Sequence, residues 1–150
     1  MPLLIRQAAS SDAGQILYFI KAIAEFEELS EEVKATEENI LKYLFGEHSV
    51  ASCLLAFEDE ICIGFALYFK NFSTFVCKPG IYLEDLFVEP NFRGKGYGKA
   101  LLMELVQLAK SLDYGRVEWS VLNWNKSAID FYESIGAKPM SGWTTYRLTL

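Results

Sequence analysis

Three glycines within six residues constrain this chain more than any other feature of its sequence. The segment reads Arg93-Gly94-Lys95-Gly96-Tyr97-Gly98. The run before it, 81–88, has the β-branched and aromatic content of a strand, and the leucines after it repeat at helical spacing. A glycine-rich turn at such a junction lets several backbone N–H groups point into one small volume, where the helix dipole and nearby basic side chains add positive charge. The segment therefore predicts a pyrophosphate site, with an ordinary glycine turn flanked by solvated basic residues as the alternative.

Two better-known phosphate loops do not match the spacing. A Walker loop has four residues between its glycines and then Lys followed by Ser or Thr, whereas Lys99 is followed by Ala100. A dinucleotide-binding fingerprint requires G-x-G-x-x-G in the first βαβ unit. Here the pattern is G-x-G-x-G and lies beyond the middle of the chain.

Residues 88–98 instead closely resemble the acetyl-CoA motif of the GNAT acetyltransferases, V-x-P-x-x-R-G-x-G-x-G/A, and depart from it at no fixed position. The resemblance implies that the loop cradles the pyrophosphate of CoA and that the preceding strand pairs with the pantetheine arm. It also implies an α/β GNAT fold, with a central mixed, mostly antiparallel sheet flanked by helices. The cofactor-binding residues that it implies are Leu86, Phe87, Val88, Arg93, Gly94, Lys95, Gly96, Tyr97, Gly98, Lys99, Asn125, Ser127 and Ala128.

The resemblance extends to the spermidine/spermine acetyltransferase branch and covers nearly the whole chain. The segments that carry it are 82–88, Trp124-Asn125, 129–132 and Gly136-Ala137. One acetyltransferase domain over residues 1–150 is expected, since 150 residues that are 51% hydrophobic suffice for one core. The related enzymes are homodimers, so a homodimer is implied as well.

The composition limits the cellular compartment and the binding partners that are expected for this protein. No window approaches 18 consecutive apolar residues, and no secretory signal is recognisable, so no membrane association is expected. Three cysteines in apolar stretches indicate reduced thiols in a cytoplasmic protein, and their spacing with the single His48 fits no metal site. A net charge of −6 argues against nucleic acid as a partner.

The periodicities predict alternating strands and helices after a hairpin-rich start. Helices are expected after Ser11-Asp12, from Thr36, across Leu101 to Leu112, and over 125–134. Residues 71–80 are expected to form a loop. Strands are expected at 3–6, 50–57, 61–69, 81–88, 116–121 and 143–150.

Acetyl transfer to an amine has three demands, and none of them requires a metal. The amine must lose a proton, the carbonyl oxygen must be stabilised, and the departing thiolate must be protonated. The resemblance makes Tyr132 the acid for the thiolate, with core packing as the alternative. It makes Glu84 the carboxylate that accepts the amine proton, directly or through water, with a structural carboxylate that only accepts hydrogen bonds as the alternative. Strand alternation is expected to place Glu84 within an apolar central strand and to turn Asp85, read as structural, to the opposite face.

The resemblance places the acceptor beside Phe26 and Glu27, although an acidic run such as this is more often a solvated face. Polyamine-specific members carry acidic residues before the final Gly-Trp, whereas residues 139–141 here are Pro-Met-Ser. This departure favours a small primary amine such as a diamine or a thialysine-like amino acid over long polyamines. Acetylation of a protein or peptide amine, or a non-catalytic acyl-CoA-binding sensor, remain the alternatives.

Overall fold

The sheet consists of five strands in chain order, β1-β2-β3-β4-β5. The first four pair antiparallel and β5 pairs parallel with β4, which confirms a mixed, mostly antiparallel sheet. The computed structural model describes residues 2–150, which divide into two compact units, one ending at Ser120 and the other Val121–Leu150. The strands, all in the first unit, are β1 Leu3–Gln7, β2 Ser52–Glu58, β3 Ile61–Ser73, β4 Lys78–Val88 and β5 Val117–Trp119.

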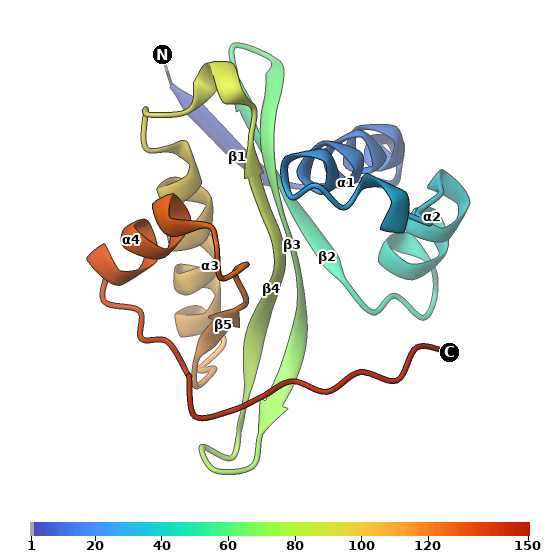
Figure 1. Ribbon diagram of the computed structural model, residues 1–150. Coiled ribbons are helices and arrows are strands. Elements are labelled where there is room, and N and C mark those ends of the chain that lie inside the picture. Colours follow the sequence, from blue (N-terminus) through green and yellow to red (C-terminus); the bar gives the residue numbers. More distant parts are fainter. Residues whose placement is uncertain (1) are drawn as a thin grey trace. The chain divides into compact units, whose positions relative to one another are not determined.

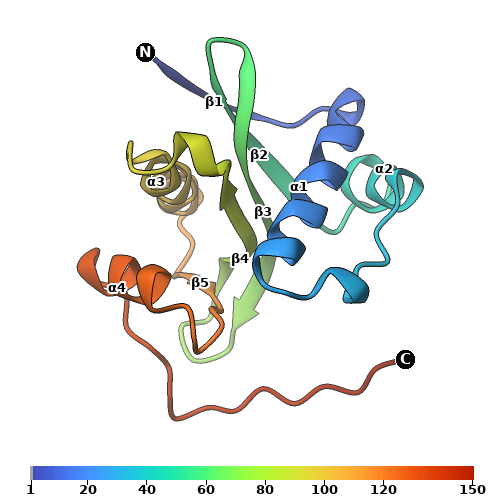
Figure 2. The same ribbon diagram turned by 45° about the horizontal axis from the view of Figure 1, so that its top comes forward.

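Helices of the first unit cover both faces of this sheet (Figures 1 and 2). Helices α1 (Ala13–Phe26) and α2 (Glu37–Phe45) lie on one face, and α3 (Tyr97–Ser111) lies on the other. On the α1 face, the ring of Phe19 stacks on Phe65 with centroids 5.1 Å apart, and both side chains are fully buried. Three short 3₁₀ helices, η1 Ser10–Asp12, η2 Ser30–Glu32 and η3 Pro90–Phe92, connect the longer elements.

Of the elements predicted from local sequence patterns, the start of one helix is confirmed and one loop is wrong. The start of α2 is confirmed, because the Thr36 hydroxyl accepts a hydrogen bond from the Asn39 N–H at 3.1 Å. The predicted loop over 71–80 is wrong, since β3 continues to Ser73 and β4 begins at Lys78. Cross-strand pairing extends through Phe72 and Pro79, so tertiary pairing overrides the turn propensity of this segment.

A β-bulge interrupts β4 at Glu84. Leu67 of β3 pairs with Asp85, but the next residue, Tyr68, pairs with Leu83, which leaves Glu84 without an opposite residue. The simple alternation expected along residues 82–87 therefore fails at this position. A bulge adds one residue to one strand, and the two-residue alternation of a strand sequence does not reveal where such an extra residue lies.

The second unit contains helix α4 (Lys126–Ser134) and an irregular C-terminal segment. The strand predicted at 143–150 is wrong: these residues have no regular secondary structure, and Tyr146 and Leu148 are both 92% exposed. A strand needs a neighbouring strand for its backbone hydrogen bonds, and residues 121–150 contain none. Across residues 2–150, no helix combines the length and the apolar character that crossing a membrane would require.

Candidate active site

The glycine loop, residues 93–98, lies between β4 and α3, at the strand-to-helix junction that the sequence predicted, and the short helix η3 lies between β4 and the loop. Gly94 and Gly96 have φ values of +83° and +82°, a region that favours glycine. A Cβ atom added to either would meet no heavy atom within 4 Å, so the space beside both is open. Gly96 is the N-cap of α3, whose first N–H groups have no acceptor inside the helix. The loop thus presents backbone donors and a helix dipole toward open space, which suits a pyrophosphate.

The three basic residues of this region occupy different environments. The Arg93 Nε donates to the Val88 carbonyl oxygen at 2.8 Å, and its guanidinium lies 5.1 Å from the rings of both Phe26 and Phe87. The Lys95 Nζ lies 3.4 Å from each carboxylate oxygen of Glu58. Lys99, in the first turn of α3, is exposed. Arg93 and Lys95 thus already have protein partners, and their part in binding a phosphate stays a prediction.

One edge of β4 has no strand beside it near the loop. β5 pairs only with residues 81–83 of β4, although β4 continues to Val88. Within residues 2–150, no strand pairs with 84–88 on the β5 side. An extended ligand that carries amide groups can add along such an edge. This segment includes Leu86, Phe87 and Val88, the strand residues predicted to contact the cofactor.

Three carboxylates gather where the bulge of β4 faces the end of α1. Asp85 is half-buried, and burial together with the nearby charges of Glu84 and Glu27 raises its pKa to about 6. Burial also raises the pKa of Glu27. Glu84 lies within β4 as expected, but its side chain is exposed, so it does not pay the cost of burial that an apolar strand implies. Of the two adjacent acids, Asp85 is the more buried one.

Phe26 lies between this carboxylate cluster and the glycine loop. It is the last residue of α1, adjacent to Glu27, and it is 44% exposed. The guanidinium of Arg93 lies over its ring. The structure therefore brings together the predicted acceptor residues Phe26, Glu27 and Glu84, and links them to the loop through Arg93.

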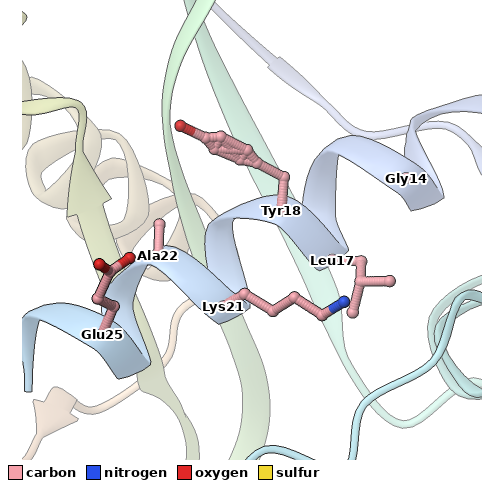
Figure 3. Close-up of a pocket in the computed structure, with 6 residues that line it drawn as sticks. All are labelled: Gly14, Leu17, Tyr18, Lys21, Ala22 and Glu25. Atoms are coloured by element: carbon pink, nitrogen blue, oxygen red, sulfur yellow. The ribbon is translucent and has the colours of Figure 1, made fainter. Parts of the chain in front are cut away.

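A pocket on the surface of α1 lies outside the predicted set (Figure 3). Tyr18 and Glu25 point to the same side of the helix, whereas Leu17 and Lys21 point away from them (Figure 3). The carboxylate of Glu89, which follows β4, raises the pKa of the exposed Tyr18 phenol. The residues that line the pocket are Gly14, Leu17, Tyr18, Lys21, Ala22 and Glu25.

The second unit holds the remaining predicted residues on one helix. The Asn125 side chain accepts a hydrogen bond from the Ala128 N–H at 3.3 Å and so caps α4. Ser127 and Ala128 occupy the first turn of this helix. Half-buried Tyr132 lies near its end, with its ring centroid 5.5 Å from that of Phe131.

The sequence does not single out two residues of this region. Asp85 is expected to be structural, because the bulge that changes its environment leaves no trace in the residue pattern. Glu58 lies outside the predicted strands and motifs, yet it is 8% exposed and contacts Lys95 and Tyr97 of the glycine loop. The signal for Glu58 was weak, because its partners lie 37 and 39 residues away.

Comparison with known proteins places this geometry in a family. The acetyltransferase (GNAT) family matches residues 17–137. A thialysine N-epsilon-acetyltransferase of Sus scrofa is 35% identical and aligns over 96% of this chain and 91% of its own length. The L-ornithine N5-acetyltransferase NATA1 of Arabidopsis thaliana is 45% identical over 61% of this chain and 40% of its own.

Solved structures agree with the fold. An integron cassette protein of V. cholerae superposes with a TM-score of 0.82 at 27% identity, over 99% of this chain and 93% of its own. The glycine loop, the open edge of β4 and the aligned relatives lead to one conclusion. The chain belongs to the GNAT acetyltransferase family, and it is an enzyme that transfers acetyl groups to amines.

Proposed function

We propose that this enzyme, a single acetyltransferase domain over residues 1–150, moves an acetyl group from acetyl-CoA directly to a primary amine of a small cationic substrate. The observation that carries the substrate class is the cluster of Glu27, Glu84 and Asp85 beside the open edge of β4. A second positive charge on the acceptor would relieve the mutual repulsion of these carboxylates.

The cofactor half of the proposal rests on the glycine loop. Its left-handed glycines, its open space and the N-terminus of α3 fit a pyrophosphate, and the GNAT family uses acetyl-CoA as a cosubstrate. The unpaired edge of β4 at 84–88 fits the amide-bearing pantetheine arm. In this arrangement a backbone N–H near Phe87 or Val88 stabilises the carbonyl oxygen as negative charge develops. Asn125 contacts the same arm through its amide NH₂, since its Oδ1 already caps α4.

The transfer itself needs three proton movements. Glu84, exposed at the bulge, accepts the proton of the acceptor ammonium through water, and the neutral nitrogen then forms its bond to the acetyl carbon. As the carbon–sulfur bond breaks, the Tyr132 hydroxyl gives its proton to the departing thiolate, and the second proton that the nitrogen loses on becoming an amide restores the Tyr132 phenol. The assignment of Tyr132 is supported by its place on α4, the helix after Asn125 on which the resembling branch has its general-acid tyrosine.

Small amino acids with a terminal amine are the favoured acceptors. The relatives are named for thialysine and L-ornithine, and the acidic residues that polyamine-specific members carry before the final Gly-Trp are missing here. We further propose that the enzyme works as a cytoplasmic homodimer, as the resembling branch does. Light scattering of the purified protein tests the dimer.

A product screen tests the proposed function. The full-length enzyme is incubated with acetyl-CoA and, separately, with ornithine, thialysine, putrescine, spermidine, spermine and an amine-bearing peptide. Mass spectrometry should find mono-acetylated ornithine, thialysine or putrescine ahead of spermine. Acetylation of the peptide alone would assign a protein substrate, and binding of acetyl-CoA without any product would refute catalysis.

A further inference from the structure

Glu58 is a buried carboxylate that the proposed chemistry does not use. It is the last residue of β2, it is 8% exposed, and it pairs with Leu3 of β1 and Ile61 of β3. A buried carboxylate is unfavourable unless charges or hydrogen bonds compensate it. The partners of Glu58 therefore indicate why it is there.

Both partners come from the glycine loop, on either side of Gly96. The Lys95 Nζ lies 3.4 Å from each oxygen of the Glu58 carboxylate, and the Tyr97 hydroxyl donates a hydrogen bond to Oε2. The Tyr97 hydroxyl and the Lys95 charge lower the pKa of Glu58, and the same hydrogen bond raises the pKa of Tyr97. The carboxylate is thus held ionised and the phenol protonated.

The loop needs such an anchor because its own residues provide little restraint. Gly94 and Gly96 lack side chains, and glycine loses more backbone entropy on ordering than any other residue. Gly96 is also the N-cap of α3, so no capping side chain fixes the start of the helix. Lys95 and Tyr97 bracket this residue and meet at one carboxylate on the neighbouring hairpin.

We propose that Glu58 is a positioning residue for acetyl-CoA, holding the glycine loop through Lys95 and Tyr97 in the conformation that receives the pyrophosphate. The inference rests on the proposed use of acetyl-CoA. Ordering the loop before the ligand arrives lowers the entropic cost of binding. A purely electrostatic view gives the opposite sign, since removing a negative charge near an anion site should tighten binding.

Two variants separate these views. Glu58→Ala removes both contacts and the charge, whereas Tyr97→Phe removes one contact and leaves the charge unchanged. Calorimetry with CoA should give affinity about five- to tenfold weaker for Glu58→Ala, and a smaller loss of the same sign for Tyr97→Phe. The exposed Glu60→Gln changes a charge in the same turn and serves as the matched control.

Two further readouts distinguish positioning from general stability. Without CoA, the backbone amides of 94–98 should exchange hydrogen faster in both variants, while the amides of β2 and β3 keep wild-type rates. The KM for acetyl-CoA should rise by a larger factor than kcat falls. If Glu58→Ala is too unstable to purify, Tyr97→Phe alone decides the direction.

The possible results distinguish a failure of the Glu58 proposal from a failure of the proposed function. Weaker binding and faster loop exchange in the variants would support the anchor. Equal or tighter binding of CoA, with wild-type exchange in the loop, would overturn it and leave the proposed function intact. A wild-type enzyme that binds no CoA would instead refute the proposed function and, with it, the role of Glu58.

Discussion

The glycine loop and the carboxylate cluster lie at the two ends of the same stretch of β4, and they handle charge in opposite ways. In the loop, Lys95 is paired with Glu58, and Arg93 is bonded to the Val88 carbonyl oxygen. In the cluster, Glu27 and Glu84 face Asp85, and no ion pair involves any of the three in residues 2–150. One region is electrostatically satisfied without a ligand and the other is not.

Under the proposed function, this difference would let one site receive two substrates of opposite charge. A satisfied loop offers backbone N–H groups in fixed positions, so an anion binds without rearranging the protein. An unsatisfied acidic cluster gains most from a cation, which replaces repulsion with attraction. We expect the first region to be sensitive to loop geometry and the second to charge and pH.

The largest expected effect lies in the transfer step, which should be separable from both regions. Tyr132→Phe keeps the ring and removes the proton, so kcat should fall roughly 10²–10⁴-fold, the usual scale for a general acid. Calorimetry should find nearly unchanged CoA affinity. A variant with wild-type kcat would make Tyr132 a packing residue and would require another group as the acid.

A change of loop geometry should act on the cofactor alone. Gly96→Val forces a β-branched residue to φ +82° and places its side chain in the open space beside the loop. Strain of about 1–3 kcal/mol should weaken CoA binding by roughly one to two orders of magnitude. At saturating acetyl-CoA, the KM for the amine should stay close to that of the wild type.

The matched control is Gly142→Val, at a turn where φ is not left-handed and an added Cβ meets no heavy atom within 4 Å. It should leave CoA affinity unchanged. Similar losses in both glycine variants would point to general destabilisation, and unchanged affinity in Gly96→Val would contradict the assignment of the loop.

A smaller effect should appear in stability when the cluster loses a charge. Asp85 has a pKa of about 6 in the folded protein, against about 3.9 in an unfolded chain. Between these values the folded state binds more protons, so stability falls as the pH rises from about 4 to about 6, and the loss persists above that. Asp85→Asn removes this loss and should stabilise the protein by about 1–3 kcal/mol at pH 8.

Thermal unfolding at pH 4 and pH 8 measures this effect. The Tm gain of Asp85→Asn over wild type should be large at pH 8 and small at pH 4. Asp59→Asn makes the same substitution at an exposed position and serves as the control. An equal gain at both pH values would show that packing, and not relief of charge repulsion, stabilises the variant.

The contrast between the regions also explains what the sequence could predict. The glycine loop is local, since its glycines, its basic residues and the following leucines lie within one strand–loop–helix segment. Its position and its left-handed glycines were therefore predictable. The contact between Glu58 and the loop was not predictable, because Glu58 reaches the loop only after β2 and α3 have packed together.

The carboxylate cluster depends on a β-bulge, which the two-residue alternation of a strand sequence does not reveal. The bulge at Glu84 leaves this acid exposed and its neighbour Asp85 half-buried, whereas alternation predicts a Glu84 enclosed by apolar residues. The prediction of a strand in the C-terminal segment was wrong for a related reason. Trp143 to Leu150 have strand-forming residues, but a strand exists only where a partner edge is present.

The measurement that tests the central claim most directly is the charge preference of the acceptor site. Values of kcat/KM are compared for ornithine, thialysine and putrescine against a neutral-tailed alkylamine of similar length, at low and moderate salt. The account predicts that acceptors with a second positive charge are preferred by about tenfold or more, and that salt reduces this preference. Preference for the neutral-tailed amine, or equal rates at every salt concentration, would contradict the account.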